Sequence, residues 1–200
     1  TETLLTTVPG TELAHEDKEA AAGTYYYRII AVDAAGNVGP ASAQASATVP
    51  AAVPDPVTLT LTPAEDSYAN QGAPNAVNGT STSLASRGSP GYTSYLRFRL
   101  GAGVPDGMRL QSATLRLYTT TESFAGSLDQ HTIHAVTGNW SEGTVTWNNR
   151  PSLASALLGT VSPVAVNTPQ TVNLDPEAVA AMLTGSVDLG ITSAGTDNAW

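Results

Sequence analysis

Arginine and tyrosine side chains recur in the middle of the chain, at a spacing that could place them together on one surface. They are Tyr95, Arg97, Arg99, Arg116 and Tyr118. A planar guanidinium group binds a carboxylate through two parallel hydrogen bonds, and a tyrosine ring can lie against a sugar ring while its hydroxyl bonds to sugar hydroxyls. Together these groups suit an anionic polysaccharide such as alginate. The alternative is a solvated sheet surface on which arginine side chains only cover apolar atoms.

Two predicted strands must position these five side chains. Residues 94–100 and 112–118 alternate apolar and polar residues, so that one face of each strand is apolar, with Leu96 and Leu115 among its members. We expect the apolar faces to point into a core. A polar connection containing Gly and Pro joins the strands, so we expect adjoining strands whose opposite face carries the arginine and tyrosine side chains.

Two tryptophans form a further candidate site for sugar. Trp140 and Trp147 flank residues 141–146. Exposed indoles are good platforms for the C–H faces of sugars, but tryptophan is also highly buried on average. Because turn residues and Pro151 share this stretch, packing is the favoured interpretation and sugar contact at the two indoles is the second.

Oxygen ligands for calcium are concentrated in the loops around Asp66 and Asn70. Ca²⁺ takes six to eight oxygen ligands, but the spacing here is not that of an EF-hand loop. Asp and Asn side chains in turns often bond their own backbone instead. Calcium at Asp66 and Asn70 is therefore a secondary hypothesis, and we otherwise expect no cofactor. The chain contains no cysteine, which excludes a disulfide and a thiolate metal site.

The residues needed for catalysis do not form a recognisable pattern. There is no Gly-x-Ser-x-Gly motif and no cysteine, and acidic residues such as Glu122 and Glu142 lie in predicted loops or strand ends. The sequence therefore predicts a module without catalytic activity. One enzymatic alternative stays open, a polysaccharide lyase that uses Arg to neutralise a uronate and Tyr or His as its base.

Composition indicates an all-β protein. Of the 200 residues, 41% are hydrophobic and only 12% are charged, and Thr, Ser, Gly, Pro and Asn fill the gaps between short apolar runs. The net charge of −9 makes nucleic acid an improbable partner. No apolar run of about 18 residues occurs, so we expect no membrane-spanning helix.

About nine strands and one short helix are predicted, which favours a β-sandwich of the jelly-roll kind. Residues 57–62 and 144–147 are two of the expected strands. The helix has clear boundary signals, since Asp175 can cap it, Pro176 suits its first position and Gly185 can end it.

The first part of the chain has a different character. Residues 25–32 read as an alternating strand, and three prolines make residues 49–56 a semi-stiff linker. Residues 23–37 resemble the last hairpin of a bacterial fibronectin type III domain, and the resemblance implies that residues 1–48 are the C-terminal part of such a domain. The resemblance implies that Tyr25 is the structural corner tyrosine of that fold. A half-sandwich of this kind should be poorly stable alone.

A second resemblance covers residues 57–200. Its blocks are residues 66–75, 78–84, 95–98, 112–118 and 140–151, and they resemble, in family order, the DNRLRE domain, also called carbohydrate-binding module family 96. Family members usually carry an acidic residue where this chain has Arg99. The block that names the family is absent before Trp200, so we expect the C-terminal strand to be missing.

These observations lead to one hypothesis and two competitors. The hypothesis is a secreted or cell-surface multidomain protein in which residues 57–200 bind a polysaccharide, of anionic type, beside other domains of the same chain. Such a module raises the effective concentration of an attached enzyme at its polymer. The competitors are a structural or adhesion module that binds no sugar, and the lyase.

Overall fold

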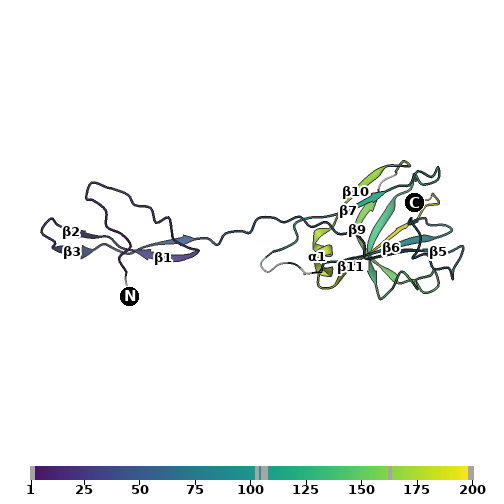
Figure 1. Cartoon of the computed structure of the whole chain (residues 1–200), viewed down its shortest axis with the longest axis horizontal. Coiled ribbons are helices and arrows are strands. Elements are labelled where there is room, and N and C mark those ends of the chain that lie inside the picture. The colour runs from purple at the N-terminus through teal and green to yellow at the C-terminus, as the bar shows by residue number, and fades with distance from the viewer. Residues whose placement is uncertain (1–2, 102–103, 105–107, 162–163, 198–200) are drawn as a thin grey trace. The chain divides into compact units, whose positions relative to one another are not determined.

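The chain divides into two units, which are described separately. A computed structural model describes residues 3–101, 104, 108–161 and 164–197. The first unit comprises Thr1–Val57 and the second Thr58–Trp200 (Figure 1). No helix within the described ranges has the length and apolar character needed to cross a membrane.

The N-terminal unit consists of two antiparallel strand pairs. Strand β1 (Gly23–Tyr27) pairs with β4 (Ala45–Val49), and β2 (Ile30–Val32) pairs with β3 (Val38–Ala41). The single strand expected over residues 25–32 is therefore two strands. No described residue of this unit is fully buried, so the four strands enclose no core of their own. Its relation to the fibronectin type III fold stays a prediction.

The C-terminal unit is built from two antiparallel sheets, and the prediction of an all-β fold with one short helix is confirmed. The larger sheet has the order β5-β6-β11-β8-β9 and the smaller pairs β10 with β7. The strands are β5 (Glu65–Asn70), β6 (Tyr92–Arg99), β7 (Ala113–Tyr118), β8 (His131–Thr137), β9 (Ser152–Val161), β10 (Pro169–Leu174) and β11 (Ser186–Ser193).

One apolar core lies between the two sheets. Alternate residues supply it, with Leu96 and Leu189 coming from the larger sheet and Leu115 and Val172 from the smaller. Because each of these strands presents its apolar side to the same core, the unit is a sandwich.

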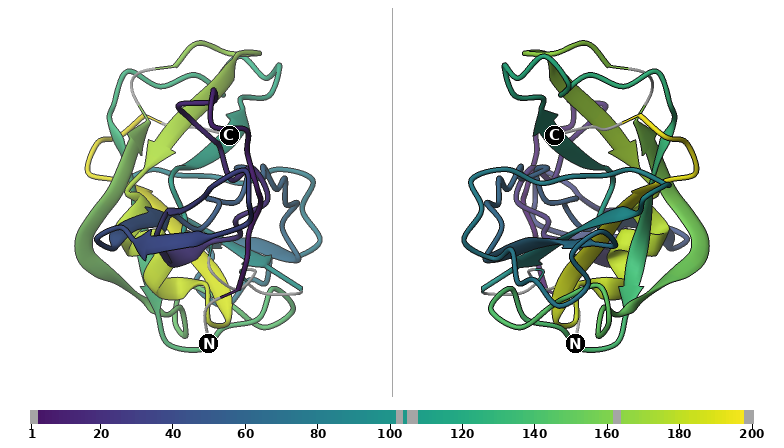
Figure 2. Two further views of the ribbon diagram at one scale, coloured as in Figure 1. Left: turned by 90° about the vertical axis from the view of Figure 1, so that its left-hand side faces the viewer. Right: turned by 90° about the vertical axis from the view of Figure 1, so that its right-hand side faces the viewer.

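The helix α1 (Pro176–Met182) begins where the sequence indicates. The Asp175 side chain accepts hydrogen bonds from the backbone N–H groups of Glu177 and Ala178, and Pro176 occupies the first turn. Val179 of this helix is buried in the core, and Figure 2 shows the yellow-green helix against the β11 ribbon that follows it.

Three expectations about strands are wrong. Residues 57–62 form no strand despite their alternation, and residues 144–147 lie in turns and irregular backbone. More importantly, residues 94–100 and 112–118 do not pair with each other, because β6 pairs with β5 and β11 whereas β7 pairs with β10. Alternation requires only that one face of a strand meets apolar atoms. Strands that face each other across a sandwich satisfy it as well as neighbours within one sheet.

Candidate functional site

The side chains that form the candidate site lie at the outer face of the larger sheet, which is the face turned away from the core between the sheets. Strand register brings outward side chains together in rows that cross the strands. In one row Glu65 lies opposite Arg97, and Arg97 lies opposite Asp188. In the next row Ser67 lies opposite Tyr95, and Tyr95 lies opposite Gly190.

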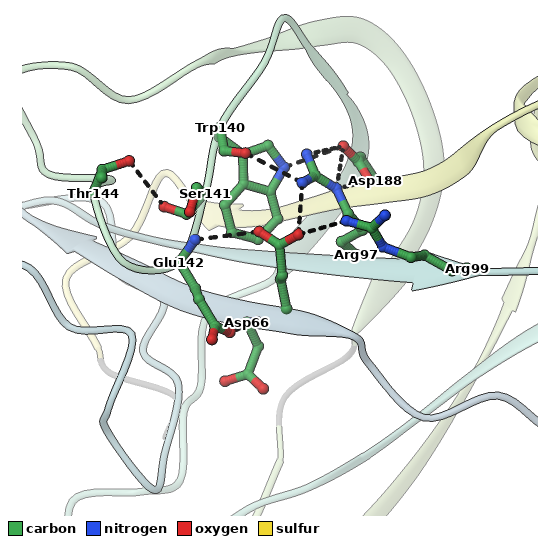
Figure 3. A network of polar contacts seen from close by, with 9 residues as sticks. Asp66, Arg97, Arg99, Trp140, Ser141, Glu142, Thr144 and Asp188 are labelled. Carbon is green, nitrogen blue, oxygen red and sulfur yellow. Dashed lines mark hydrogen bonds and ion pairs between the residues drawn. The ribbon is translucent and has the colours of Figure 1, made fainter.

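One half of this face is closed by an ion network around Arg97. Its Nε and Nη2 atoms donate to the two carboxylate oxygens of Asp188 at 2.9 and 2.8 Å (Figure 3). Its Nη1 atom donates to Glu65 Oε1 at 3.0 Å. The guanidinium carbon lies 4.8 Å from the centre of the Trp140 ring, and Nη1 also donates to the Trp140 carbonyl. Only 12% of the Arg97 side chain is exposed.

The network neutralises its own charges. Burial opposes ionisation of Asp188 and Glu65, but hydrogen bonds from arginine outweigh it, so the pKa values of both carboxyls lie below their usual range. The same hydrogen bonds, first of all with Asp188, raise the pKa of Arg97. A guanidinium saturated in this way has little left to offer a carboxylate of a ligand.

The predicted surface of five arginine and tyrosine residues does not exist as one surface. Tyr95 is 1% exposed and its hydroxyl donates to the Pro151 carbonyl. Arg99 is exposed but its Nη2 atom donates to Glu65 at 2.7 Å. Arg116 and Tyr118 are exposed on β7, in the other sheet.

This correction follows from the pairing of the strands, since residues on different sheets of a sandwich cannot share an outer face. Sugar contacts by Arg99, Arg116 and Tyr118 individually stay predictions.

The two tryptophans differ in their surroundings. Trp140 is 8% exposed, packs against the Tyr95 ring with centroids 5.6 Å apart, and donates from Nε1 to Asp188 at 3.2 Å. It belongs to a second apolar cluster on the outer face, with Ala69 and Val145. Trp147 is only partly buried and lines a groove. Trp140 therefore has a packing role, whereas Trp147 is accessible to a ligand.

Asp66 and Asn70 lie apart and have separate surroundings. Both sit on β5 four residues apart, which is about 13 Å along a strand. Burial, and then the charge of Glu142, raise the pKa of the Asp66 carboxyl, while the Asn70 side chain accepts from the Gly72 N–H group. Within the described residues no group of three or more His, Cys, Asp or Glu is arranged to hold a metal ion. A shared calcium site at Asp66 and Asn70 has no geometric support there.

The other half of the outer face is an open groove of about 470 Å³. Its lining consists of Thr93, Tyr95, Trp147, Arg150, Pro151, Ser152, Leu153 and Thr192. Leu153 covers Gly190, where a Cβ atom would lie only 2.2 Å from the leucine side chain. The groove thus combines the apolar side chains of Trp147, Pro151 and Leu153 with hydroxyl groups and one cation, so it offers both apolar and hydrogen-bonding contacts.

Trp147 and Arg150 are held against each other at the rim of this groove. The guanidinium carbon of Arg150 lies 3.6 Å from the centre of the indole ring, and its Nη1 atom donates to the Trp147 carbonyl. In the turn just before β6, Gly91 leaves room for the indole, because a Cβ atom there would lie 2.3 Å from the ring. A turn positions both residues, in which Asn149 accepts from the Thr146 N–H group at 2.6 Å.

Arg150 differs from Arg97 in having no carboxylate within ion-pair distance among the residues that the structure describes. Arg150 has no place in the alternating pattern of a strand, because it follows a turn, and strand alternation therefore does not indicate it as a site residue. A usable signal was present in the spacing of Trp147 and Arg150, three residues apart in a tight turn followed by Pro151. Thr93 and Thr192 carried no comparable signal.

The C-terminal unit matches a known protein family. The model of the family described as carbohydrate-binding module family 96 matches residues 57–200. A search of curated proteins finds no match. The match covers the whole unit that contains the groove and the ion network.

Proposed function

The chain belongs to carbohydrate-binding module family 96, and we propose that its C-terminal unit binds a polysaccharide in the groove at Trp147 and Arg150 without transforming it. The observation that carries this proposal is the stacked Trp147 and Arg150 pair, whose cation has no carboxylate partner among the described residues, at the rim of an open groove.

Trp147 and Arg150 would divide the recognition between them. The indole offers apolar area to the C–H groups of a sugar ring. A guanidinium that stacks through its flat face keeps N–H donors in its own plane, where they can bind a carboxylate bidentately. The hydroxyl groups of Thr93 and Thr192 add hydrogen-bonding groups at the floor. This division supports an acidic polysaccharide such as alginate as the ligand.

Tyr95 supports a binding role over a lyase role. Burial raises the pKa of its hydroxyl to about 12, and that hydroxyl donates to the Pro151 carbonyl. A group with this pKa and this partner is poorly suited to remove a proton from a sugar at neutral pH. An ultraviolet assay for unsaturated products on alginate and pectate is expected to show no signal above buffer, and a steady release of product would overturn this part of the proposal.

The module would act by attachment. In a protein that is secreted or displayed on the cell surface, reversible binding keeps neighbouring domains close to the polymer and raises their effective concentration there. The proposed partners are therefore the polysaccharide and the other domains of the parent chain, and no nucleic acid.

Affinity gel electrophoresis with alginate, pectate and a neutral glucan tests the proposal. We expect a uronate polymer to retard the protein. Arg150→Gln should weaken binding about tenfold or more, because a hydrogen bond to a charged group contributes about 1.5–3 kcal/mol. Arg116→Gln is the matched control, since Arg116 is an exposed arginine on the other sheet.

Two outcomes contradict the proposal in different ways. If no polymer retards the protein, the unit is not a polysaccharide-binding module. If Arg116→Gln abolishes retardation and Arg150→Gln does not, the site lies on β7 and the groove is not the binding surface.

A further inference from the structure

Four threonines cross the outer face of the larger sheet in one row, starting at the groove. We call Thr93, Thr192, Thr132 and Thr160 the threonine row. Thr192 lies opposite Thr132, and Thr132 lies opposite Thr160. Thr93 precedes Ser94, whose partner is Ile191, so the same register sets Thr93 beside Thr192. The row therefore takes one hydroxyl from each of the adjacent strands β6, β11, β8 and β9.

The hydroxyl groups of this row are available to a ligand. Thr93 is 7% exposed and lines the groove, and its hydroxyl has no hydrogen-bond partner among the described residues. Among the described residues, the side-chain oxygens that are both fully buried and without a hydrogen-bond partner belong to Ser67 and Thr120. The Thr93 oxygen is not one of them, so it keeps some exposure to the groove.

The rest of the row is more open. Thr192 and Thr160 are half-buried and their hydroxyls also have no partner among the described residues. The Thr132 hydroxyl donates weakly to the Thr192 carbonyl at 3.4 Å, which leaves its oxygen free to accept.

The two ends of the row differ. On β5, the residue opposite Thr93 is Ala69, which is fully buried in the cluster with Trp140 and Val145. On the other side, Thr160 lies on β9, the last strand of the sheet. A ligand that enters at Trp147 and Arg150 thus meets a wall toward β5 and a line of hydroxyls toward β9.

We propose that the polysaccharide lies across the strands along the threonine row, so that a full site takes a run of about four sugars. This inference rests on the proposed function and adds the direction and length of the ligand. Neighbouring strands are about 4.8 Å apart, so the row spans about 14 Å. In an extended chain of pyranose sugars, the advance per sugar is similar to the spacing between neighbouring strands. Each threonine of the row can therefore meet the hydroxyls of a successive sugar.

Threonine also favours strands for steric reasons, which is the ordinary explanation for an outward threonine. What distinguishes the row is the hydroxyl of Thr93, which has no partner among the described residues although the residue is only 7% exposed, and which lies in register with three further hydroxyls.

Calorimetric titration with alginate and glucan oligosaccharides of two to six units tests the inference. Affinity should rise with length up to about four units and then level off. The double variant Thr132→Val with Thr160→Val should bind the six-unit ligand about tenfold more weakly, from the loss of two hydrogen bonds. It should bind the two-unit ligand like the wild type, because that ligand is held by Trp147 and Arg150.

The controls separate failure of this inference from failure of the proposed function. Thr171→Val changes an exposed threonine on β10 of the other sheet and should have no effect. Thr132→Ser with Thr160→Ser retains the hydroxyls and should retain affinity, which assigns the effect to the hydroxyl groups and not to the methyl groups. If polymers bind the wild type but length and the valine variant have no effect, the threonine row is not part of the site. If nothing binds the wild type, the proposed function itself fails.

Discussion

The outer face of the larger sheet contains two pairs of arginine and tryptophan with opposite electrostatic surroundings. In the covered half, Arg97 lies over Trp140 and is bound by the carboxylates of Glu65 and Asp188. In the open half, Arg150 lies over Trp147 with no such partner among the described residues. In the first pair Trp140 is buried and the Arg97 side chain is 12% exposed, whereas the second pair lines a groove.

This difference shows that the residue types alone do not define a binding site. An arginine stacked on an indole stabilises the fold when carboxylates of the same chain compensate its charge, because removing any partner leaves an uncompensated buried charge. The same pair can serve a ligand when its N–H donors face solvent. The covered half should therefore respond to mutation in stability, and the open half in binding.

The largest effect is expected for the two indoles. Trp140→Ala should lower the free energy of unfolding by about 3–5 kcal/mol, because it removes a buried aromatic side chain that packs on Tyr95. Trp147→Ala should cost clearly less stability and should abolish polysaccharide retardation. Urea denaturation and affinity electrophoresis of both variants provide the measurements. Equal losses of stability would remove the distinction between the two halves.

Replacement of Arg97 comes next. Arg97→Met should lower the free energy of unfolding by about 3 kcal/mol, because Glu65 and Asp188 would lose the cation that compensates them. Arg99→Met is the matched control and should change stability by less than about 0.5 kcal/mol, since its side chain is 62% exposed. Polymer binding by folded Arg97→Met should match the wild type. A large loss of binding with little loss of stability would place the ligand on the covered half.

Substitution of Gly91 can displace the Trp147 indole in the open half, because Gly91 packs against that ring. Gly91→Ala would place a Cβ atom 2.3 Å from the Trp147 ring, so the indole must move. We expect a cost of about 1–3 kcal/mol from overpacking, together with weaker polymer binding and a changed tryptophan fluorescence spectrum. Gly143→Ala, where a Cβ atom meets nothing within 4 Å, is the control. Unchanged binding in Gly91→Ala would show that the position of Trp147 is unimportant.

The smallest of these effects is expected from acid, which should reduce the stability that the ion network of the covered half contributes. The folded pKa values of Glu65 and Asp188 lie below their usual values of 4.5 and 3.8, so the unfolded chain binds protons more readily. The stabilisation is complete above those usual values and is lost as pH falls through the lowered folded values. In urea denaturation between pH 6 and pH 3, the free energy of unfolding should fall more steeply with decreasing pH in the wild type than in Arg97→Met. Parallel curves would contradict this account of the network.

Several features of the fold could be predicted from local sequence. The helix α1 begins with the cap at Asp175 and Pro176, and both act on backbone groups within one turn. The inward residues Leu96 and Leu115 were identified by alternation and lie in the core. These features depend on residues close together in the chain, so a single sequence contains the necessary information.

The candidate site was less accessible to prediction. Tyr95 and Trp147 were proposed and do line the groove, whereas Arg150 and the threonines were not proposed. Arg97 was expected on a free surface and is instead enclosed by Glu65 and Asp188. Asp188 is 91 residues further along the chain, and no local pattern indicates that it would reach Arg97.

Alternation along β6 and β7 specified which side of each strand is buried, and the local signals around Pro176 specified the helix. The identity of the neighbouring strand was settled in three dimensions, because many pairings bury the same apolar faces and the choice among them depends on the packing of the whole unit. That choice placed Arg97 beside two carboxylates, left Arg150 without one in the described chain, and brought four distant threonines into one row.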